Sequence, residues 1–256
     1  MTEELLVTTD GPIRTFTLNR PNRRNALTPS LAALLARQVS EAGQEPDVRL
    51  AVIRGAGGHF TVGLDLHWMA EFGASPSNDQ IAEGLKSFQE AIHAVVRSPL
   101  PIVAGLQGSV AGFGVDLALA CDMRYADDTV RFTSGFARIG LVPDGGSTDR
   151  LPHLIGPSRA FKFFVDGSTI DARYAQEIGL VDSVVDGALD EELQRLGGAV
   201  AQSSRGSIAS IKYLIERHNG SGLTDTLAAE GREQLAALQG ADFRQRLTAF
   251  VNGNVQ

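Results

Sequence analysis

Two glycine-containing turns are the segments whose residues could do chemistry, in this case on a carbonyl group. The first turn spans residues 59–66 (HFTVGLDL) and the second spans residues 108–117 (GSVAGFGVDL). A helix that starts after such a turn has free backbone N–H groups and a partial positive charge, and glycine lets a ligand approach the backbone. If the turns face each other, two N–H groups can donate to one carbonyl oxygen, which is an oxyanion hole. The spacing alone favours the simpler interpretation of two ordinary strand-to-helix turns.

Other common catalytic sites are not predicted by the sequence. It contains no HExxH, P-loop or GxSxG motif, and its five histidines lack the spacing of metal ligands. The single cysteine, Cys121, excludes an intramolecular disulfide and a multi-cysteine metal site, and its apolar surroundings favour a packing role. We therefore expect no metal site.

The composition indicates a globular α/β protein. The 256 residues (27.2 kDa) are 43% hydrophobic and 21% charged, which suits one large domain or a domain with an appendage. The 23 basic and 30 acidic side chains give a net charge of −7, which argues against a nucleic-acid partner. The chain starts without a basic and apolar signal pattern, and its most apolar stretch, residues 100–121, is interrupted by Gln107, Ser109 and Asp116. We expect a soluble, cytoplasmic protein with no membrane partner.

Hydrophobic periodicity predicts strands mixed with helices, followed from residue 189 by helices alone. Thr28 can cap a helix that has Pro29 at its first position, and Asp10-Gly11 is typical of a hairpin. Strands are expected at residues 5–7, 13–18, 50–53, 101–106, 123–125, 130–132 and 180–185. Helices are expected at residues 29–39, 81–95, 115–120, 159–165, 172–178, 189–202, 208–217, 223–238 and 243–251, and a loop at residues 73–79.

Four groups of residues resemble the crotonase superfamily, also called the enoyl-CoA hydratase/isomerase family, over nearly the whole chain. They are residues 18–21 (LNRP) with 24–27 (RNAL), 60–66 (FTVGLDL), 112–117 (GFGVDL) with 121–126 (CDMRYA), and 139–146 (IGLVPDGG). The resemblance implies an α/β fold, a crotonase-like ββα spiral core with the acyl-CoA site in residues 1–195, and a C-terminal helical trimerisation region in residues 196–256. It also implies a homotrimer or a hexamer (dimer of trimers). The implied substrate is an acyl-CoA thioester, with coenzyme A as part of the substrate and no separate cofactor.

The resemblance assigns roles to residues of both turns. The backbone N–H groups of Leu64 and Phe113 are implied to form the oxyanion hole, although the family usually has glycine where Phe113 stands. Substrate or CoA contacts are implied for Arg24, Ala26, Val62, Gly63, Leu64, Asp65, Leu66, Gly112 and Phe136. His67 stands where some hydratases have a lysine for a CoA phosphate, so CoA is expected either to be held by other residues such as Arg23 or Arg24 or to be held weakly.

The acidic residues indicate the reaction. Enoyl-CoA hydratases use two glutamates to activate water, and this sequence resembles them with Asp116 at the first position and Phe136 at the second. Phenylalanine cannot exchange a proton, but Asp144, on a tight turn, supplies another carboxylate. Residues 114–117 and 139–152 are most similar to delta-3,5-delta-2,4-dienoyl-CoA isomerases, which have aspartates at both positions and a glutamate where Phe136 stands. An aspartate at the Asp144 position also occurs in ring-forming and ring-isomerising members and in an aryl-CoA dehalogenase.

The resulting hypothesis is an acyl-CoA enzyme that stabilises a thioester enolate and shifts a proton with Asp116 and Asp144, which isomerises a double bond. Two buried aspartates are expected to titrate as a coupled pair, with one pKa raised. Each also has a structural interpretation, Asp116 in the first turn of a helix and Asp144 in a tight turn. The alternatives are a hydratase that adds water to a 2-enoyl-CoA and a non-catalytic acyl-CoA binding member. The carboxylates of Asp65 and Asp122 are expected to be structural.

Overall fold

The computed structural model describes residues 3–71, 78–186, 189–218 and 223–252. Its larger sheet has the strand order β1 (Leu5–Asp10), β2 (Ile13–Leu18), β3 (Leu50–Gly55), β4 (Ile102–Leu106), β6 (Met123–Ala126) and β9 (Ser183–Val184). The first two strands form an antiparallel hairpin, and all later neighbours in this sheet are parallel. A smaller sheet pairs β5 (Ser109–Ala111) with β7 (Arg131–Thr133), and β7 with β8 (Thr169–Asp171).

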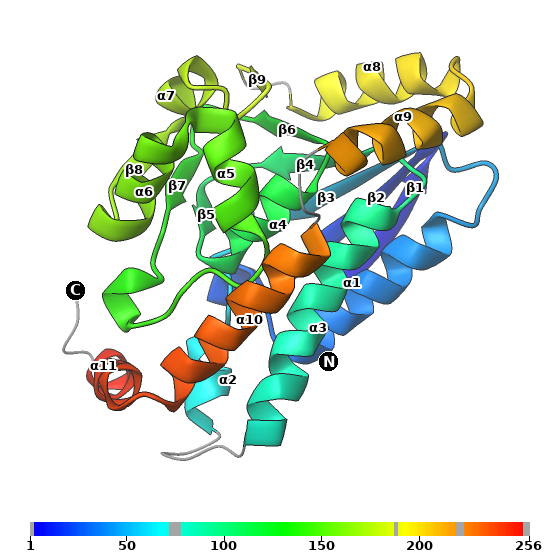
Figure 1. The fold of residues 1–256 in the computed structure, drawn as a ribbon. Coiled ribbons are helices and arrows are strands. Elements are labelled where there is room, and N and C mark those ends of the chain that lie inside the picture. The colour runs from blue at the N-terminus through cyan, green and yellow to red at the C-terminus, as the bar shows by residue number, and fades with distance from the viewer. Residues whose placement is uncertain (1–2, 72–77, 187–188, 219–222, 253–256) are drawn as a thin grey trace.

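Helices cover both faces of the larger sheet. On one face α1 (Pro29–Ala42) and α3 (Asn78–Arg97) lie side by side, and α8 (Leu189–Ala201) packs on the other face (Figure 1). Alternate residues of β3 serve the two cores: Ala51 and Ile53 join the larger core, whereas Leu50 and Val52 pack with α8. Because β3 is buried on both faces, its sequence is a continuous apolar run rather than an alternating one.

The remaining helices and two 3-10 turns complete the described structure. They are α2 (Leu66–Glu71), α4 (Phe113–Ala120), α5 (Ser147–Ile155), α6 (Pro157–Asp166), α7 (Ala172–Glu177), α9 (Arg205–His218), α10 (Leu223–Gln239) and α11 (Ala241–Val251), with 3-10 turns η1 (Pro21–Arg23) and η2 (Ala137–Ile139). Every residue of α4 is buried. Helix α10 packs on α3 and α5, and α11 packs on α2 and η2, so these last two helices lie over elements from the middle of the chain (Figure 1).

Most predicted elements are confirmed. The Thr28 hydroxyl accepts a hydrogen bond from the Leu31 N–H at 3.3 Å, which is the expected helix cap. Helix α4 begins two residues before its predicted start, and of the strand predicted at residues 180–185 only Ser183–Val184 is a strand. The loop predicted at residues 73–79 is wrong for Asn78 and Asp79, which begin α3, and its residues 73–77 lie outside the described residues.

Besides the two 3-10 turns, two α-helices and two strands were not predicted, because their local signals are weak. Helix α5 contains Pro152, a residue that normally ends a helix, yet the helix continues to Ile155. Strands β5 and β8 have three residues each, too few for an alternating pattern to be recognised. Helix α2 is a short helix of six residues.

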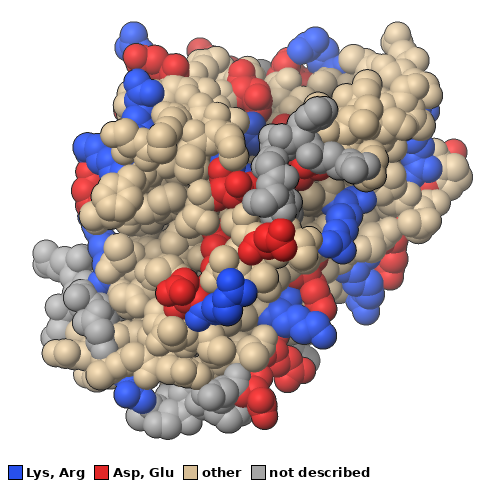
Figure 2. All heavy atoms as spheres, in the orientation of Figure 1, with Lys and Arg blue, Asp and Glu red and all other residues tan. Residues whose placement is uncertain are grey.

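The structure bears only in part on the predicted division of the chain and on the predictions about membrane and nucleic-acid partners. The expected division after residue 195 falls within α8, and it remains a prediction. Over the described residues, no helix has the length and apolar character needed to cross a membrane. Figure 2 shows basic and acidic side chains interspersed over the visible face, without a continuous basic area.

Candidate active site

The two glycine-containing turns lie against each other, as the oxyanion-hole hypothesis requires. Thr61 and Val110 form a parallel bridge, and the Ala111 N–H donates to the Thr61 carbonyl at 3.0 Å. Gly63 has a φ of +85°, and a Cβ built there would lie 2.7 Å from the Phe113 nitrogen and 2.8 Å from the Ala111 carbonyl oxygen. Only glycine therefore allows the first turn to approach the start of α4 this closely.

The N–H groups of Leu64 and Phe113 are available to a ligand. Leu27 bonds to the main chain on either side of Leu64, through the Gly63 carbonyl and the Asp65 N–H. Phe113 is the first residue of α4, so its N–H has no partner in the preceding turn of that helix. Within the described part of the chain, neither N–H donates a hydrogen bond, and both residues lie on the wall of one cavity.

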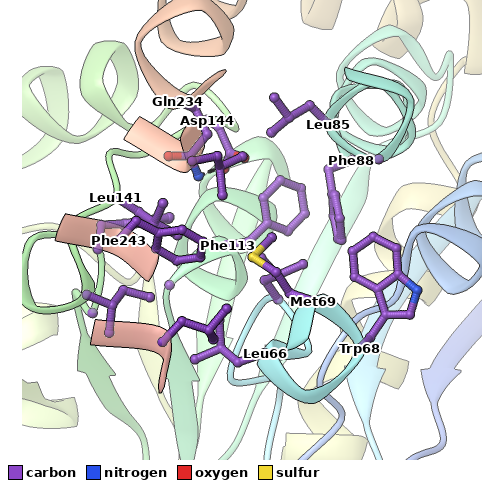
Figure 3. A pocket seen from close by; sticks show the side chains of 18 of the residues that line it. Leu66, Trp68, Met69, Leu85, Phe88, Phe113, Leu141, Asp144, Gln234 and Phe243 are labelled. Carbon is purple, nitrogen blue, oxygen red and sulfur yellow. Dashed lines mark hydrogen bonds between the residues drawn. The ribbon is translucent and has the colours of Figure 1, made fainter. Parts of the chain in front are cut away.

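This cavity has a volume of about 210 Å3, and its wall is largely apolar (Figure 3). The large apolar side chains on its wall belong to Leu66, Trp68, Met69, Ile81, Leu85, Phe88, Phe113, Phe136, Ile139, Leu141, Leu238, Phe243 and Leu247. The ring of Phe88 meets the ring of Phe113 edge-on, with centroids 4.9 Å apart. Asp144 and Gln234 lie together at one end of the view, whereas Leu66 and Trp68 lie at the other. Such a cavity suits an apolar acyl chain that ends near one carboxyl group.

Asp144 is the predicted carboxyl that lies on the cavity wall. Its side chain is 6% exposed, and its Oδ2 accepts a hydrogen bond from the Gln234 amide at 3.4 Å. Burial, together with the negative charge of Glu230, raises the pKa of Asp144 to about 7. A carboxyl with this pKa holds and releases a proton near neutral pH, as an acid–base group must.

Asp116 lies one layer deeper and does not contribute to the cavity wall. It is fully buried in α4, and one oxygen accepts a hydrogen bond from the Ser147 N–H at 3.0 Å, while Oδ2 has no partner among the described residues. A Cβ at Gly145 would lie 2.5 Å from the Asp116 Cβ, so the Asp144 loop packs directly on this side chain. Burial, with the charges of Asp144 and Glu230, raises the pKa of Asp116 well above its usual range. The two aspartates therefore interact, but the pKa values of both are raised, whereas only one was expected to be.

Two residues of α10 belong to this site and were not predicted from the sequence. Glu230, 6% exposed, accepts hydrogen bonds from the Gly146 N–H at 2.6 Å and from the N–H and hydroxyl of Thr148. Gln234, 2% exposed, accepts from the Val142 N–H at 3.1 Å and donates to Asp144. Their signal in the sequence is the spacing of four residues, which places two polar side chains on the face of α10 that also carries Leu227 and Leu238.

The other predicted contacts divide into two groups. Val62, Leu64, Leu66, Gly112, Phe113 and Phe136 lie on the cavity wall with Asp144. Of the described residues, Arg24, Ala26, Gly63, Asp65 and Asp116 are not part of that wall. Asp65 forms an ion pair with Arg20 at 2.8 Å and accepts the N–H groups of His67 and Trp68 at the start of α2, which is the structural role expected for it. Arg24 is exposed on the surface. No cluster of metal-ligating side chains occurs among the described residues.

The comparisons with known proteins agree with this fold. The family model described as enoyl-CoA hydratase/isomerase matches residues 8–254. A 2,3-dehydroadipyl-CoA hydratase of Escherichia coli K12 is 32% identical over 97% of this chain and 95% of its own length. A peroxisomal delta(3,5)-delta(2,4)-dienoyl-CoA isomerase of Arabidopsis thaliana is 30% identical over 69% of this chain and 66% of its own length. The crystal structure of an enoyl-CoA hydratase/isomerase from Xanthobacter autotrophicus Py2 has a TM-score of 0.91 at 25% identity, covering 99% of this chain and 95% of that one.

The fold and the comparisons together define an enzyme with the crotonase fold. The chain belongs to the enoyl-CoA hydratase/isomerase family, the crotonase superfamily. One of the relatives above is named a hydratase and another an isomerase, so family membership is consistent with an acyl-CoA substrate and does not decide the reaction.

Proposed function

We propose that this enzyme moves a proton along an unsaturated acyl-CoA and thereby isomerises its double bond. The observation that carries the proposal is the position of Asp144, the one carboxyl that the described residues place on the wall of a largely apolar cavity. The same wall contains Leu64 and Phe113, whose N–H groups are available to a thioester oxygen.

In the proposed reaction, the thioester carbonyl accepts hydrogen bonds from the Leu64 and Phe113 N–H groups. These donors stabilise the enolate that forms when a proton leaves the α-carbon or, through conjugation, the γ-carbon. The carboxylate form of Asp144 takes that proton, and the protonated form returns it to a different carbon of the same chain. A pKa of about 7 keeps both forms accessible near neutral pH.

Asp116 supports this step from behind the cavity wall. Its raised pKa favours the protonated, neutral form, so it does not place a second negative charge beside Asp144. We assign the proton transfer that touches the substrate to Asp144, and to Asp116 the role of the neutral neighbour.

The apolar wall supports isomerisation over hydration. A hydratase must hold and activate a water molecule, yet the polar side chains on the described wall are only those of Asp144, Gln234 and Arg244. Phe136, at the position where the sequence resembles hydratases that have glutamate, is buried with Leu141, Leu238 and Phe243 in an apolar cluster. Because one of the relatives is named a hydratase, hydration is the alternative that an experiment must distinguish from isomerisation.

Two further expectations are part of the proposal. The chain is proposed to act as a homotrimer or a dimer of trimers, and exposed apolar side chains on α6 and α9 support this, among them Phe161, Val165, Ile211 and Leu214. Light scattering after size-exclusion chromatography tests it, and a monomer would contradict it. Acyl-CoA is proposed to react without a separate cofactor, and a cytoplasmic location remains a prediction.

The reaction is tested with crotonyl-CoA and a 3,5-dienoyl-CoA, each in deuterated water. We expect the dienoyl-CoA to gain conjugated-diene absorbance, with deuterium incorporated whenever Asp144 exchanges its proton with solvent. Faster loss of the enoyl absorbance of crotonyl-CoA would favour a hydratase. Binding of both thioesters without any turnover would favour the non-catalytic alternative.

Substitution of Asp144 tests the residue that carries the proposal. We expect Asp144→Asn to lower kcat for isomerisation by roughly 10²–10⁴-fold while the affinity for the thioester is kept, because the amide cannot accept the proton. The matched control is Asp128→Asn, the same change at an exposed position, which should leave kcat unchanged. Wild-type turnover by Asp144→Asn would overturn the proposal.

A further inference from the structure

Helix α10 presents two polar residues on the face that packs against the protein. Leu227, Glu230, Gln234 and Leu238 are spaced by three, four and four residues, and all four are buried. A buried carboxylate and a buried amide on such a face reduce stability unless their hydrogen bonds are satisfied. Both side chains direct their hydrogen bonds to one segment, residues 142–148.

The two side chains hold this segment along its whole length. Gln234 binds the Val142 N–H with its oxygen and the Asp144 carboxyl with its nitrogen. Glu230 binds the N–H groups of Gly146 and Thr148 at the start of α5. Gly146, at the N-cap position of α5, has a φ of +91° and no side chain to cap the helix. Glu230 therefore supplies that cap from a helix more than eighty residues further along the chain.

Three acidic groups in addition to Asp144 lie at or near this segment. Asp116 faces it from α4 and Glu230 faces it from α10, while Asp149 of α5 acts on Glu230. Arg244 of α11 lies on the same cavity wall but is exposed. The three buried carboxyls are those of Asp116, Asp144 and Glu230. The Glu230 carboxylate accepts the most hydrogen bonds and lies at the N-terminus of α5, so it is the group best able to carry the negative charge.

The geometry points to Glu230 and Gln234 as positioning residues that fix the Asp144 carboxyl at the cavity wall and set its charge through contacts from α10. The inference rests on the proposed function, because it requires Asp144 to carry the proton. Glu230 does not line the cavity, whereas Gln234 does. Negative charge on Glu230 disfavours negative charge on Asp144, whereas the hydrogen bond from the Gln234 amide favours negative charge on Asp144.

The test uses two substitutions with opposite expected effects on the pH dependence of kcat. Glu230→Gln removes a negative charge beside Asp144, so the kcat limb that reports Asp144 should move to lower pH by roughly one unit. Gln234→Glu replaces the amide donor by a carboxylate, so the same limb should move to higher pH. The control is Glu233→Gln on the exposed side of the same helix, which should keep the wild-type limb.

A purely structural role predicts a different result. Loss of folding stability alone lowers the amount of active enzyme at every pH and leaves the limb where it is. For Glu230→Gln we also expect a lower kcat with the wild-type KM for the dienoyl-CoA, because Glu230 does not touch the cavity. An unmoved limb in both variants would overturn the inference.

The failures of the inference and of the proposed function can be told apart. If Glu230→Gln does not fold, the direction of the shift in Gln234→Glu decides the inference alone. If Asp144→Asn is inactive and neither α10 variant moves the limb, the inference is wrong and the proposed function stands. If Asp144→Asn turns over as the wild type does, the proposed function itself is wrong.

Discussion

Two of the buried groups of ionisable side chains in the described part of the protein are built on opposite principles. In the first, the Lys212 ammonium on α9 donates to the Val95 and Leu100 carbonyls at 3.0 Å and to the Asp122 carboxylate at 2.8 Å. In the second, Asp116, Asp144 and Glu230 lie together with no cation among their described hydrogen-bond partners. We call them the lysine cluster and the carboxyl cluster.

The difference between the clusters separates a structural from a chemical use of buried charge. In the lysine cluster each charge has a partner, and the cluster ties α9 to the end of α3 and to the segment before β4. In the carboxyl cluster an Asp116 oxygen has no partner among the described residues, and burial together with neighbouring negative charge raises the pKa values of Asp116 and Asp144. Uncompensated acidic groups at a cavity are typical of proton transfer rather than of stability.

Breaking the lysine cluster should have the largest effect on stability. Lys212→Met leaves the Asp122 carboxylate and two carbonyls without their donor, so we expect a loss of about 3 kcal/mol in the free energy of unfolding. Urea denaturation measures it. The control is Lys162→Met, which breaks the exposed pair with Asp166 and should change stability little. Equal effects of the two substitutions would contradict the comparison.

Gly63→Ala tests the backbone amide donors of the two turns without changing either cluster. The added Cβ would lie 2.7 Å from the Phe113 nitrogen at a φ that side chains disfavour, so the two turns must move apart. We expect kcat to fall by about 100-fold, the loss typical of one oxyanion donor. Gly198→Ala is the control, because nothing lies near the new methyl group. Unchanged kcat in Gly63→Ala would show that these amides do not act on the substrate.

Asp116→Asn should have a smaller effect on the free energy of unfolding than Lys212→Met, and of opposite sign. The raised pKa of Asp116 means that the folded protein binds this proton more tightly than the unfolded chain. Stability from this group is therefore fully present below the ordinary aspartate pKa and is lost as the pH rises toward the folded-state value. Asparagine removes that loss, so at about pH 8 the variant should be more stable by on the order of 1 kcal/mol. Thermal unfolding across the pH range measures the stability of the variant relative to the wild type. A relative stability that falls as the pH rises would refute the prediction.

Local sequence was sufficient for most of the fold. The apolar runs of β3 and β4 and the periodicity of α3 depend on neighbouring residues alone, and they predicted those elements. Helix α5 was missed because tertiary contacts, including the cap from Glu230, outweigh Pro152. The propensity of a segment does not include a partner that arrives from another helix.

The site was predictable only in part. The sequence motifs predicted that the two turns face each other and that the two aspartates interact, and the structure describes this geometry. The sequence did not show that Asp144 reaches the cavity while Asp116 does not, since the depth of Asp116 behind the wall depends on the packing of Gly145. It also missed Glu230, because acidic residues on a helix usually face water and only the contacts of α10 reveal which side is covered.

The attachment of residues 142–148 to α10 has a consequence for synthesis of the protein. The chain leaves the ribosome from its N-terminus, so every strand of both sheets emerges before Leu227 to Leu238 do. A nascent chain can thus assemble its hydrophobic layers while Asp144 still lacks its two anchors. Activity should be acquired late, only after α10 has docked, which confines this acid–base group to nearly finished molecules.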